Sequence, residues 1–149
     1  MAEEIKLDVG CGLHKEEGHI GIDKCKQSDA DIFLDVTRQK LPYDDDSVDH
    51  IFTKHTLEHF DFEGVVFVMN EFWRVMKPGH LLHAIVPNRK GEGAWTLSHK
   101  TYWDENSFRF FEQRRNNRLY GVKLWKIVEM VTNKRPDTHC KMEPIKLHE

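Results

Sequence analysis

The stretch that decides the fold is LDVGCGLHKEEGHIGID, residues 7–23. Its first four residues are typical of an apolar strand that runs into a glycine turn. Its last four are typical of a second strand that ends in an acid, Asp23. Only nine residues, 11–19, separate the two. A turn of the nucleotide-binding type normally opens a helix. This stretch therefore predicts such a turn leading into a loop.

Working outward, the sequence predicts seven strands and two helices. The expected strands are residues 5–9, 19–23, 31–36, 48–54, 81–87, 124–132 and 139–146. Residues 62–76 have apolar side chains at the 3.6-residue spacing of a helix, which Lys77-Pro78-Gly79 should end. Residues 104–116 predict a second helix, with Asp104 as its N-cap and Phe108 and Phe111 on one face.

This order of elements predicts an α/β fold with one largely parallel sheet and an antiparallel hairpin at its C-terminal edge. Parallel strands covered on both faces are almost uniformly apolar. Here the first three strands alternate apolar and polar residues, as in Ile5, Leu7 and Val9 against Lys6 and Asp8. The alternation predicts one covered face and one open face. It agrees with the lack of a helix after the first and second strands.

Composition sets the class of protein. The 149 residues predict one domain, 1–149, which has 39% hydrophobic and 32% charged residues. No apolar run approaches the length of a membrane span, and residues 1–6 lack the apolar core of a signal peptide. The three cysteines, Cys11, Cys25 and Cys140, are scattered and odd in number, which predicts free thiols and a cytoplasmic protein.

The net charge of −3 hides an asymmetry between the two parts of the chain. Residues 1–99 carry a net charge of −7 and residues 100–149 a net charge of +4. The basic part includes Arg114, Arg115, Arg118, Lys123 and Lys126. Such a run is most often a solvated surface, and the alternative is a docking patch for an anionic partner.

The D-x-G-x-G pattern at residues 8–12 is the first motif that carries chemistry. Glycines at positions 10 and 12 let the backbone turn sharply and let a ligand lie against it without a Cβ in the way. Asp23, at the end of the next strand, is placed to accept hydrogen bonds from ribose hydroxyls. A third glycine and a following helix are missing, which argues against a nicotinamide-dependent enzyme.

Several blocks of the chain together resemble class I S-adenosylmethionine-dependent methyltransferases, in particular the small type 11-like methyltransferase-domain group. The blocks are LDVGCG, GHIGID, LDVTRQKLPYDDDSVDHIFTKHTLEHF and EFWRVMKPGHLLHAIVPN, in the family's order over residues 5 to about 111. The resemblance implies a Rossmann-like methyltransferase sheet, reduced by the missing helices, and S-adenosylmethionine as cofactor.

The resemblance also implies roles for individual residues. The turn that holds the methionine part of the cofactor matches Asp8, Gly10, Cys11 and Gly12. The ribose-binding acid matches Asp23, and the positions beside the adenine match Asp35 and Val36. The place where cofactor and acceptor meet matches Lys54 and His55. Because a helix N-terminus is missing near the cofactor carboxylate, we expect weaker cofactor binding or a partner that completes the site.

Histidines are the candidate general bases. We predict catalytic roles for His55 and His99, and a capping or packing role for Glu58 and His59. His55 and His59 would share a face if their segment were helical. A metal site of His55, His59 and His99 has only one pair at ligand spacing, so we predict no metal.

The acceptor is not specified by the sequence. Trp95, Tyr102 and Trp103 either line an aromatic acceptor pocket or pack the fold. The Asn/Asp-Pro-Pro-Tyr/Phe signature of nucleic-acid amino-methyltransferases is absent, and Thr-Lys-His-Thr stands at 53–56 instead. We therefore expect a small-molecule, glycan or protein acceptor, and no nucleic acid.

Two functions remain open at this point. One is methyl transfer, and the other is a cofactor-binding or catalytically inactive subunit that acts through a partner. In either case we expect a homo-oligomer, a dimer formed through the uncovered sheet face, because apolar residues at the margins of that face would be exposed in a monomer.

Overall fold

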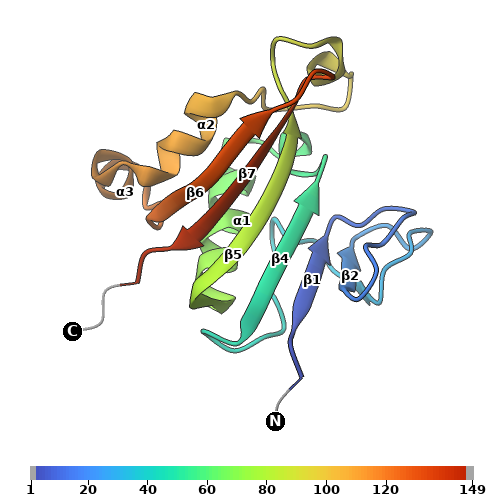
Figure 1. The fold of residues 1–149 in the computed structure, drawn as a ribbon. Helices are drawn as coiled ribbons and strands as arrows, with labels where there is room; N and C mark the ends of the chain where they lie inside the picture. The colour runs from blue at the N-terminus through green and yellow to red at the C-terminus, as the bar shows by residue number, and fades with distance from the viewer. Residues whose placement is uncertain (1–2, 147–149) are drawn as a thin grey trace.

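One seven-stranded sheet organises the protein, whose computed structural model describes residues 3–146 (Figure 1). The strand order is β3-β2-β1-β4-β5-β7-β6, and β7 alone runs antiparallel to its neighbours β5 and β6. The strands are β1 Lys6–Val9, β2 Ile20–Asp23, β3 Ile32–Phe33, β4 Val48–Lys54, β5 Met76–Pro87, β6 Trp125–Thr132 and β7 Asp137–Pro144. The predicted α/β class, the seven strands and the C-terminal hairpin are confirmed.

All helical elements of the described residues come after β4 in the chain. They are η1 Leu57–His59, α1 Phe62–Val75, η2 Glu92–Trp95, α2 Glu105–Arg109, η3 Phe110–Glu112 and α3 Arg114–Tyr120. In Figure 1, α1 lies behind the strands, and α2 and α3 lie beside β6. No helix within the described part of the chain is long and apolar enough to cross a membrane.

Helix α1 forms as its apolar spacing predicts. Asp61 caps it, accepting a hydrogen bond of 2.8 Å from the Gly64 amide. Its inward face, which includes Met69 and Phe72, packs against the strands and is buried, whereas Phe62 in the first turn is exposed. Burial of each such side chain contributes about 2 kcal/mol, so this contact supplies much of the core energy. The helix ends at Val75, as expected from the proline that follows.

The fifth strand begins earlier than predicted. We expected residues 81–87, whereas β5 begins at Met76 and includes Pro78 and Gly79. The pairing of β5 with β4 shifts register between Val48 and His50, so these residues form an irregular start to the strand. Proline lacks an amide donor and Gly79 has a φ of 77°, and both are tolerated at such a bulge.

The prediction of one helix over 104–116 is wrong in its extent. The N-cap is confirmed, because the Asp104 carboxylate accepts from the Ser107 amide at 3.2 Å, and Phe108 and Phe111 are both buried. However, the segment consists of α2, η3 and α3, with an extended residue at Gln113. The Asn116 side chain donates to a carbonyl of η3, which stabilises the break.

Strand β3 is also shorter than the predicted 31–36. The chain leaves the sheet after Phe33 and turns, because the amides of Arg38 and Gln39 donate to the carbonyl of Asp35. The Gln39 side chain in return accepts from the Asp35 amide at 2.9 Å. This turn places residues 34–36 beyond the end of the strand, where they can contact a ligand.

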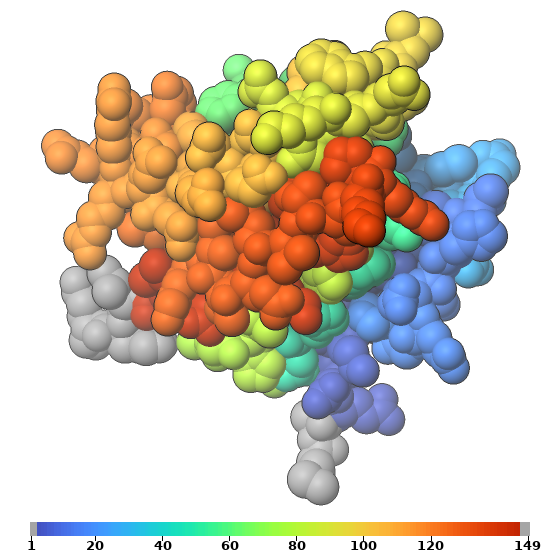
Figure 2. Space-filling view, turned by 45° about the horizontal axis from the view of Figure 1, so that its top comes forward, coloured from blue at the N-terminus to red at the C-terminus, as the bar shows by residue number. Residues whose placement is uncertain are grey.

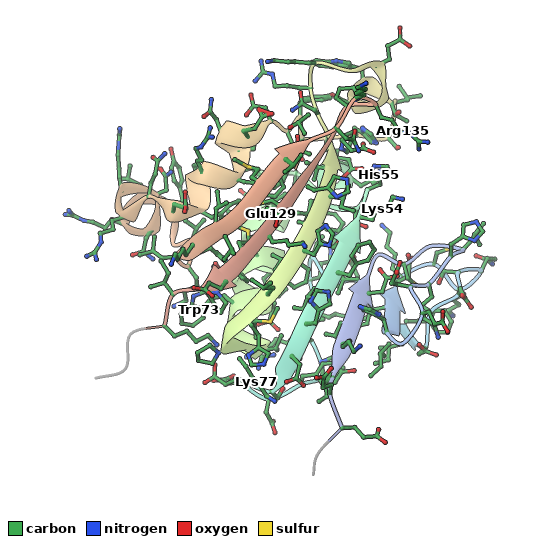
Figure 3. All side chains as sticks on the ribbon, viewed as in Figure 1. Lys54, His55, Trp73, Lys77, Glu129 and Arg135 are labelled. Carbon is green, nitrogen blue, oxygen red and sulfur yellow. The ribbon has the colours of Figure 1, made fainter. Side chains whose placement is uncertain are left out.

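The sheet face opposite α1 has no helix over it among residues 3–146, as Figure 1 shows. Residues 10–19 form a loop, which confirms the predicted loss of the helix after β1. The strand register puts one polar-rich row across this face, made of Asp8, Phe52, His83, Lys141 and Glu129. The open face is thus largely polar, and Glu129 lies on it halfway along the edge strand β6 (Figure 3).

Arg74 of α1 fixes the segment that follows the β3 turn. Its guanidinium donates to the carbonyls of Tyr43 and Leu41 at 2.9 and 3.0 Å. It also donates to both carboxylate oxygens of Glu71, and Glu71 accepts from the Leu41 amide at 2.8 Å. The side chains of Arg74 and Glu71 therefore connect α1 to the loop of residues 38–45.

We predict that Arg74→Met lowers the free energy of unfolding by about 2 kcal/mol, because it leaves the Glu71 carboxylate largely buried without its charged partner. The double variant Glu71→Leu/Arg74→Met should recover part of that loss, since no charge then stays buried. Urea denaturation at pH 7 measures both. A loss below about 0.5 kcal/mol for the single variant would show that the pair contributes little.

Candidate functional site

A cavity opens at the carboxyl ends of β1, β2 and β4, where ligands bind in open α/β sheets. Its volume is about 290 Å³. Lys54 and His55 mark the end of β4 at this edge in Figure 3. The cavity is lined by Gly10, Gly12, Ile22, Asp23, Lys24, Leu34, Asp35, Val36, His55, Thr56, His59 and Phe60. Six of the ten predicted site residues line it.

The glycine turn after β1 forms one wall of the cavity. Gly10 has a φ of 74° and Gly12 a φ of 57°, both in the left-handed region that favours glycine. A Cβ at Gly10 would overlap the side chain of Thr56, so the turn lies directly against the start of the segment after β4. A Cβ at Gly12 would meet nothing within 4 Å, so its position faces open space. The turn is thus packed on one side and accessible on the other.

Asp23 joins the end of β2 to this turn. Its carboxylate accepts hydrogen bonds from the amide of Gly12 at 3.0 Å and from that of Cys25 at 2.9 Å. Each carboxylate oxygen has about two acceptor sites, so one on each oxygen stays available. Two backbone donors therefore fix the carboxylate while it can still accept hydrogen bonds from a pair of hydroxyl groups.

The opposite wall is apolar with one acidic residue. Ile22, Leu34, Val36 and Phe60 provide flat apolar surface. Beside them, Asp35 accepts from the hydroxyl of Thr37 at 2.6 Å and from its amide. The hydroxyl bond is the main reason that the pKa of Asp35 is lowered, so the side chain is ionised at neutral pH. A planar polar ring could lie against this wall with its polar edge near the acid.

Asp8 and Cys11 do not line the cavity and instead support the turn from behind. The buried Asp8 carboxylate accepts from the Glu16 amide at 2.8 Å, which holds the loop that replaces the helix. Burial raises the pKa of Asp8, and the Glu16 bond partly offsets that effect. Burial, with the nearby Asp8, raises the pKa of the Cys11 thiol to about 11, so this thiol is protonated at neutral pH.

His55 lies at the mouth of the cavity, and its ring Nε2 is 3.0 Å from a carboxylate oxygen of Asp137 on β7. Its backbone has a φ of 51°, so the expected helical segment does not start there. The 3₁₀ helix η1 begins two residues later. His55 and His59 therefore do not share a helix face. Lys54, the remaining predicted contact, is exposed and outside the cavity lining.

His59 and His99 come together instead. Their ring centroids are 4.7 Å apart in an edge-to-face arrangement. His99 lies behind the cavity wall, with Nδ1 bonded to the Ala94 carbonyl at 2.9 Å and Nε2 at 3.9 Å from the Glu58 carboxylate. Burial lowers the pKa of His59, with a further contribution from His99, and burial raises the pKa of Glu58 to about 7.

The three aromatic residues Trp95, Tyr102 and Trp103 lie between β5 and α2 and play two different roles. Trp103 is buried and packs against Phe108 and Phe111. Trp95 and Tyr102 stack on each other at the surface, with ring centroids 4.5 Å apart. None of the three lines the cavity at the carboxyl ends of the strands.

Sequence reasoning missed two residues at this site. Thr56 donates to the Lys54 carbonyl at 3.0 Å and fills the space that Gly10 leaves. The only indication of this role in the sequence was that Thr56 comes two residues after the end of the predicted strand 48–54. Asp137 is 82 residues from the histidine that it contacts, and nothing local in the sequence indicates that contact.

Comparison with known proteins shows what the sequence and the fold are similar to. Residues 19–84 match a family model described as a methyltransferase domain. Together with the fold, this match supports a class I S-adenosylmethionine-dependent methyltransferase. The match begins after the glycine turn, so the contacts of that turn rest on the structure. No curated protein matches the sequence.

Solved structures with this fold include three informative neighbours. A chain in the complex of the Haloferax volcanii Trm112 methyltransferase activator with a methyltransferase is 16% identical, with a TM-score of 0.69 and coverage of 99% of this chain and 86% of that one. An Archaeoglobus fulgidus S-adenosylmethionine-dependent methyltransferase is 16% identical, with a TM-score of 0.66 and coverage of 94% and 86%. The Bradyrhizobium japonicum N-methyltransferase NodS, in complex with S-adenosylhomocysteine, is 11% identical, with a TM-score of 0.67 and coverage of 96% and 79%.

The family match and these neighbours indicate S-adenosylmethionine as the cofactor of this protein. The residues present fit that molecule. Gly12 leaves open space at the turn, Asp23 keeps free acceptor sites for ribose hydroxyls, and the wall near Leu34 is apolar enough for an adenine. The cavity therefore offers the chemical groups that such a cofactor would need, although the helix after β1 is missing.

We predict that Gly10→Ala destabilises the protein more than Gly18→Ala does. Both positions have φ near 75°, so both alanines carry about 1–2 kcal/mol of backbone strain. Only the Cβ at Gly10 also overlaps a buried side chain, whereas that at Gly18 meets nothing within 4 Å. Thermal unfolding of both variants measures the difference, and equal melting temperatures would contradict the close contact with Thr56.

Proposed function

We propose that this protein transfers the methyl group of S-adenosylmethionine to a small-molecule, glycan or protein acceptor. The observation that carries the proposal is the junction of Gly12 and Asp23, where an open glycine position and an acid fixed by two amides meet at one cavity. A subunit that had lost the cofactor would have little reason to keep two acids, Asp23 and Asp35, beside that cavity with acceptor sites still free.

The bound cofactor supplies an electrophilic methyl group on a sulfonium, so the protein's main task is alignment and exclusion of water. Gly10 and Gly12 would hold the methionine part, Asp23 the ribose, and Asp35 and Val36 the adenine. Asp8 and Cys11, which we predicted as contacts, would act through the turn that they support. Lys54 is exposed beside the mouth and would meet the acceptor there.

His55 is the proposed general base. The contact with Asp137 supports this role, because a carboxylate that accepts from Nε2–H leaves Nδ1 free to take a proton from an acceptor. The side chain is 44% exposed at the cavity mouth, where an acceptor can reach it. The role predicted for His99 is supported less, because its side chain is only 7% exposed and lies behind the wall.

A second candidate function is a cofactor-binding subunit that acts through a partner. The uncovered sheet face favours it, and the Haloferax neighbour was solved in complex with an activator. The partner predicted for this chain is a second copy. Lys141 and Glu129 lie side by side in the register of the open face, so a two-fold axis there would place unlike charges opposite each other. We further propose that the protein acts in the cytoplasm.

Calorimetric titration of S-adenosylmethionine and S-adenosylhomocysteine into the protein tests the cofactor site. We expect saturable binding that Asp23→Asn weakens by about 100-fold, because the variant loses the charge-assisted hydrogen bonds of the ribose. Asp44→Asn, at an exposed acid outside the cavity, is the matched control and should bind normally. Equal binding by the two variants would remove Asp23 from the site. No binding by the folded wild-type protein would favour the partner-dependent function.

The role of His55 is tested by methyl transfer from labelled cofactor to fractions of a cell extract. We expect His55→Asn to lower transfer by about 100-fold and to leave S-adenosylhomocysteine binding unchanged. Asparagine tolerates the positive φ at this position, so the backbone is preserved. His80→Asn, at an exposed histidine at the start of β5, is the control. Transfer at the wild-type rate in His55→Asn would rule out a general base at this position.

A further inference from the structure

Glu58 is the least explained polar residue near the cofactor cavity. It belongs to η1, its side chain is 1% exposed, and neither carboxylate oxygen has a hydrogen-bond partner. A carboxylate buried without partners costs several kcal/mol unless a cation or donor satisfies it. We expected a capping or packing role for Glu58; its side chain caps nothing, and packing alone leaves its carboxylate without a partner.

Two histidines bring ring nitrogens to this carboxylate. Nε2 of His99 is 3.9 Å from Oε2 of Glu58, and one donor atom from each of Glu58, His59 and His99 lies within 4.8 Å of the others. Two donors on a single transition-metal ion, each at about 2.1 Å, lie up to about 4.2 Å apart. Small side-chain rotations would therefore let all three groups reach one ion.

The hydrogen bonding of His99 orients it as a ligand. Its Nδ1–H donates to the carbonyl of Ala94 at 2.9 Å, which leaves the lone pair of Nε2 directed toward Glu58. Histidines that bind metal usually donate their second ring nitrogen to a carbonyl or carboxylate in this way, which fixes both tautomer and ring orientation. The histidine is thus prepared to accept a cation at Nε2.

Backbone hydrogen bonds hold the two ligand-bearing segments together. The amides of Lys100 and Thr101 both donate to the carbonyl of Glu58, at 2.8 and 3.1 Å. The hydroxyl of Thr101 also donates to the carbonyl of Leu57 at 3.3 Å. The segment after β5 that carries His99 folds over this end of the sheet (Figure 2). The three groups are therefore brought together by the fold.

We propose that Glu58, His59 and His99 form a binding site for a divalent transition-metal ion such as Zn²⁺ or Mn²⁺. One carboxylate and two imidazoles are a ligand set that suits these ions. Three protein ligands leave at least one coordination position open, and His59 lies on the wall of the cofactor cavity. The site replaces the weaker combination of His55, His59 and His99 that the sequence spacing suggests, and it revises our prediction of no metal.

A second histidine pair makes a useful internal comparison. His83 and His139 lie on the open sheet face with ring nitrogens 3.3 Å apart. Their neighbour Asn133 is a weak metal ligand, and within residues 3–146 only the Glu58 cluster has three histidine, cysteine or acidic ligands at this spacing. The sheet-face pair is therefore the competing surface site that an experiment has to separate from the proposed one.

Metal titration of the full chain after chelator treatment tests the proposal. Zn²⁺ and Mn²⁺ are followed by calorimetry and Co²⁺ by visible absorption, which reports nitrogen and oxygen ligation directly. We expect one saturable site per chain. Glu58→Gln and His99→Gln should each weaken binding by about 100-fold or more, because each removes a ligand. His139→Gln, the matched control, should bind as the wild type does.

Two results would overturn the proposal. One is the absence of saturable binding in the wild-type protein, and the other is binding that His139→Gln abolishes but Glu58→Gln retains, which would place the ion on the sheet face. Circular dichroism shows whether each variant is folded, and if Glu58→Gln does not fold, His99→Gln decides. Titration of S-adenosylhomocysteine into the same proteins keeps the metal proposal separate from the proposed methyl transfer, because either site can fail alone.

Discussion

The contact between Gly10 and Thr56 is the constraint on which the rest of the site depends. It joins the end of β1 to the segment after β4, with no room for a side chain between them. Because Gly10 turns at this contact, its amide reaches the carbonyl of Ile22 at 2.7 Å and the Gly12 amide reaches Asp23. Three strand ends are thereby held around one cavity, by contacts that involve mostly backbone atoms.

Where the helix after β1 is missing, carboxylates hold the replacing loop in place by accepting hydrogen bonds from backbone amides. Asp8 holds the loop through the amide of Glu16, and Asp31 accepts from the amide of Gly21 at 2.8 Å while it pairs with Lys15 at 3.0 Å. The Gly21 bond and Lys15 lower the pKa of Asp31. A loop fixed in this way can present the glycine turn without covering the sheet. This explains how a class I methyltransferase fold tolerates one bare face.

Sequence patterns correctly predicted the elements whose formation depends on residues close together in the chain. The strand–turn–strand of residues 7–23, the α1 stripe and the Asp104 cap all follow from spacing of one to four residues. The break within 104–116 was missed because it depends on the Asn116 side chain reaching back to Phe110. The pairing of His59 with His99 could not be read from local spacing, because it depends on the distant amides of Lys100 and Thr101 donating to the carbonyl of Glu58.

The two-residue length of β3 has a consequence for how the protein meets other chains. An edge strand offers its free amides and carbonyls to any extended segment, and a long flat edge invites strand addition and aggregation. β3 presents too few such groups to template another strand. The opposite edge, β6, is longer, but Lys126 and Glu129 interrupt its apolar residues with charge. Both edge strands are therefore protected against the addition of further strands, β3 because it is short and β6 because it carries charges.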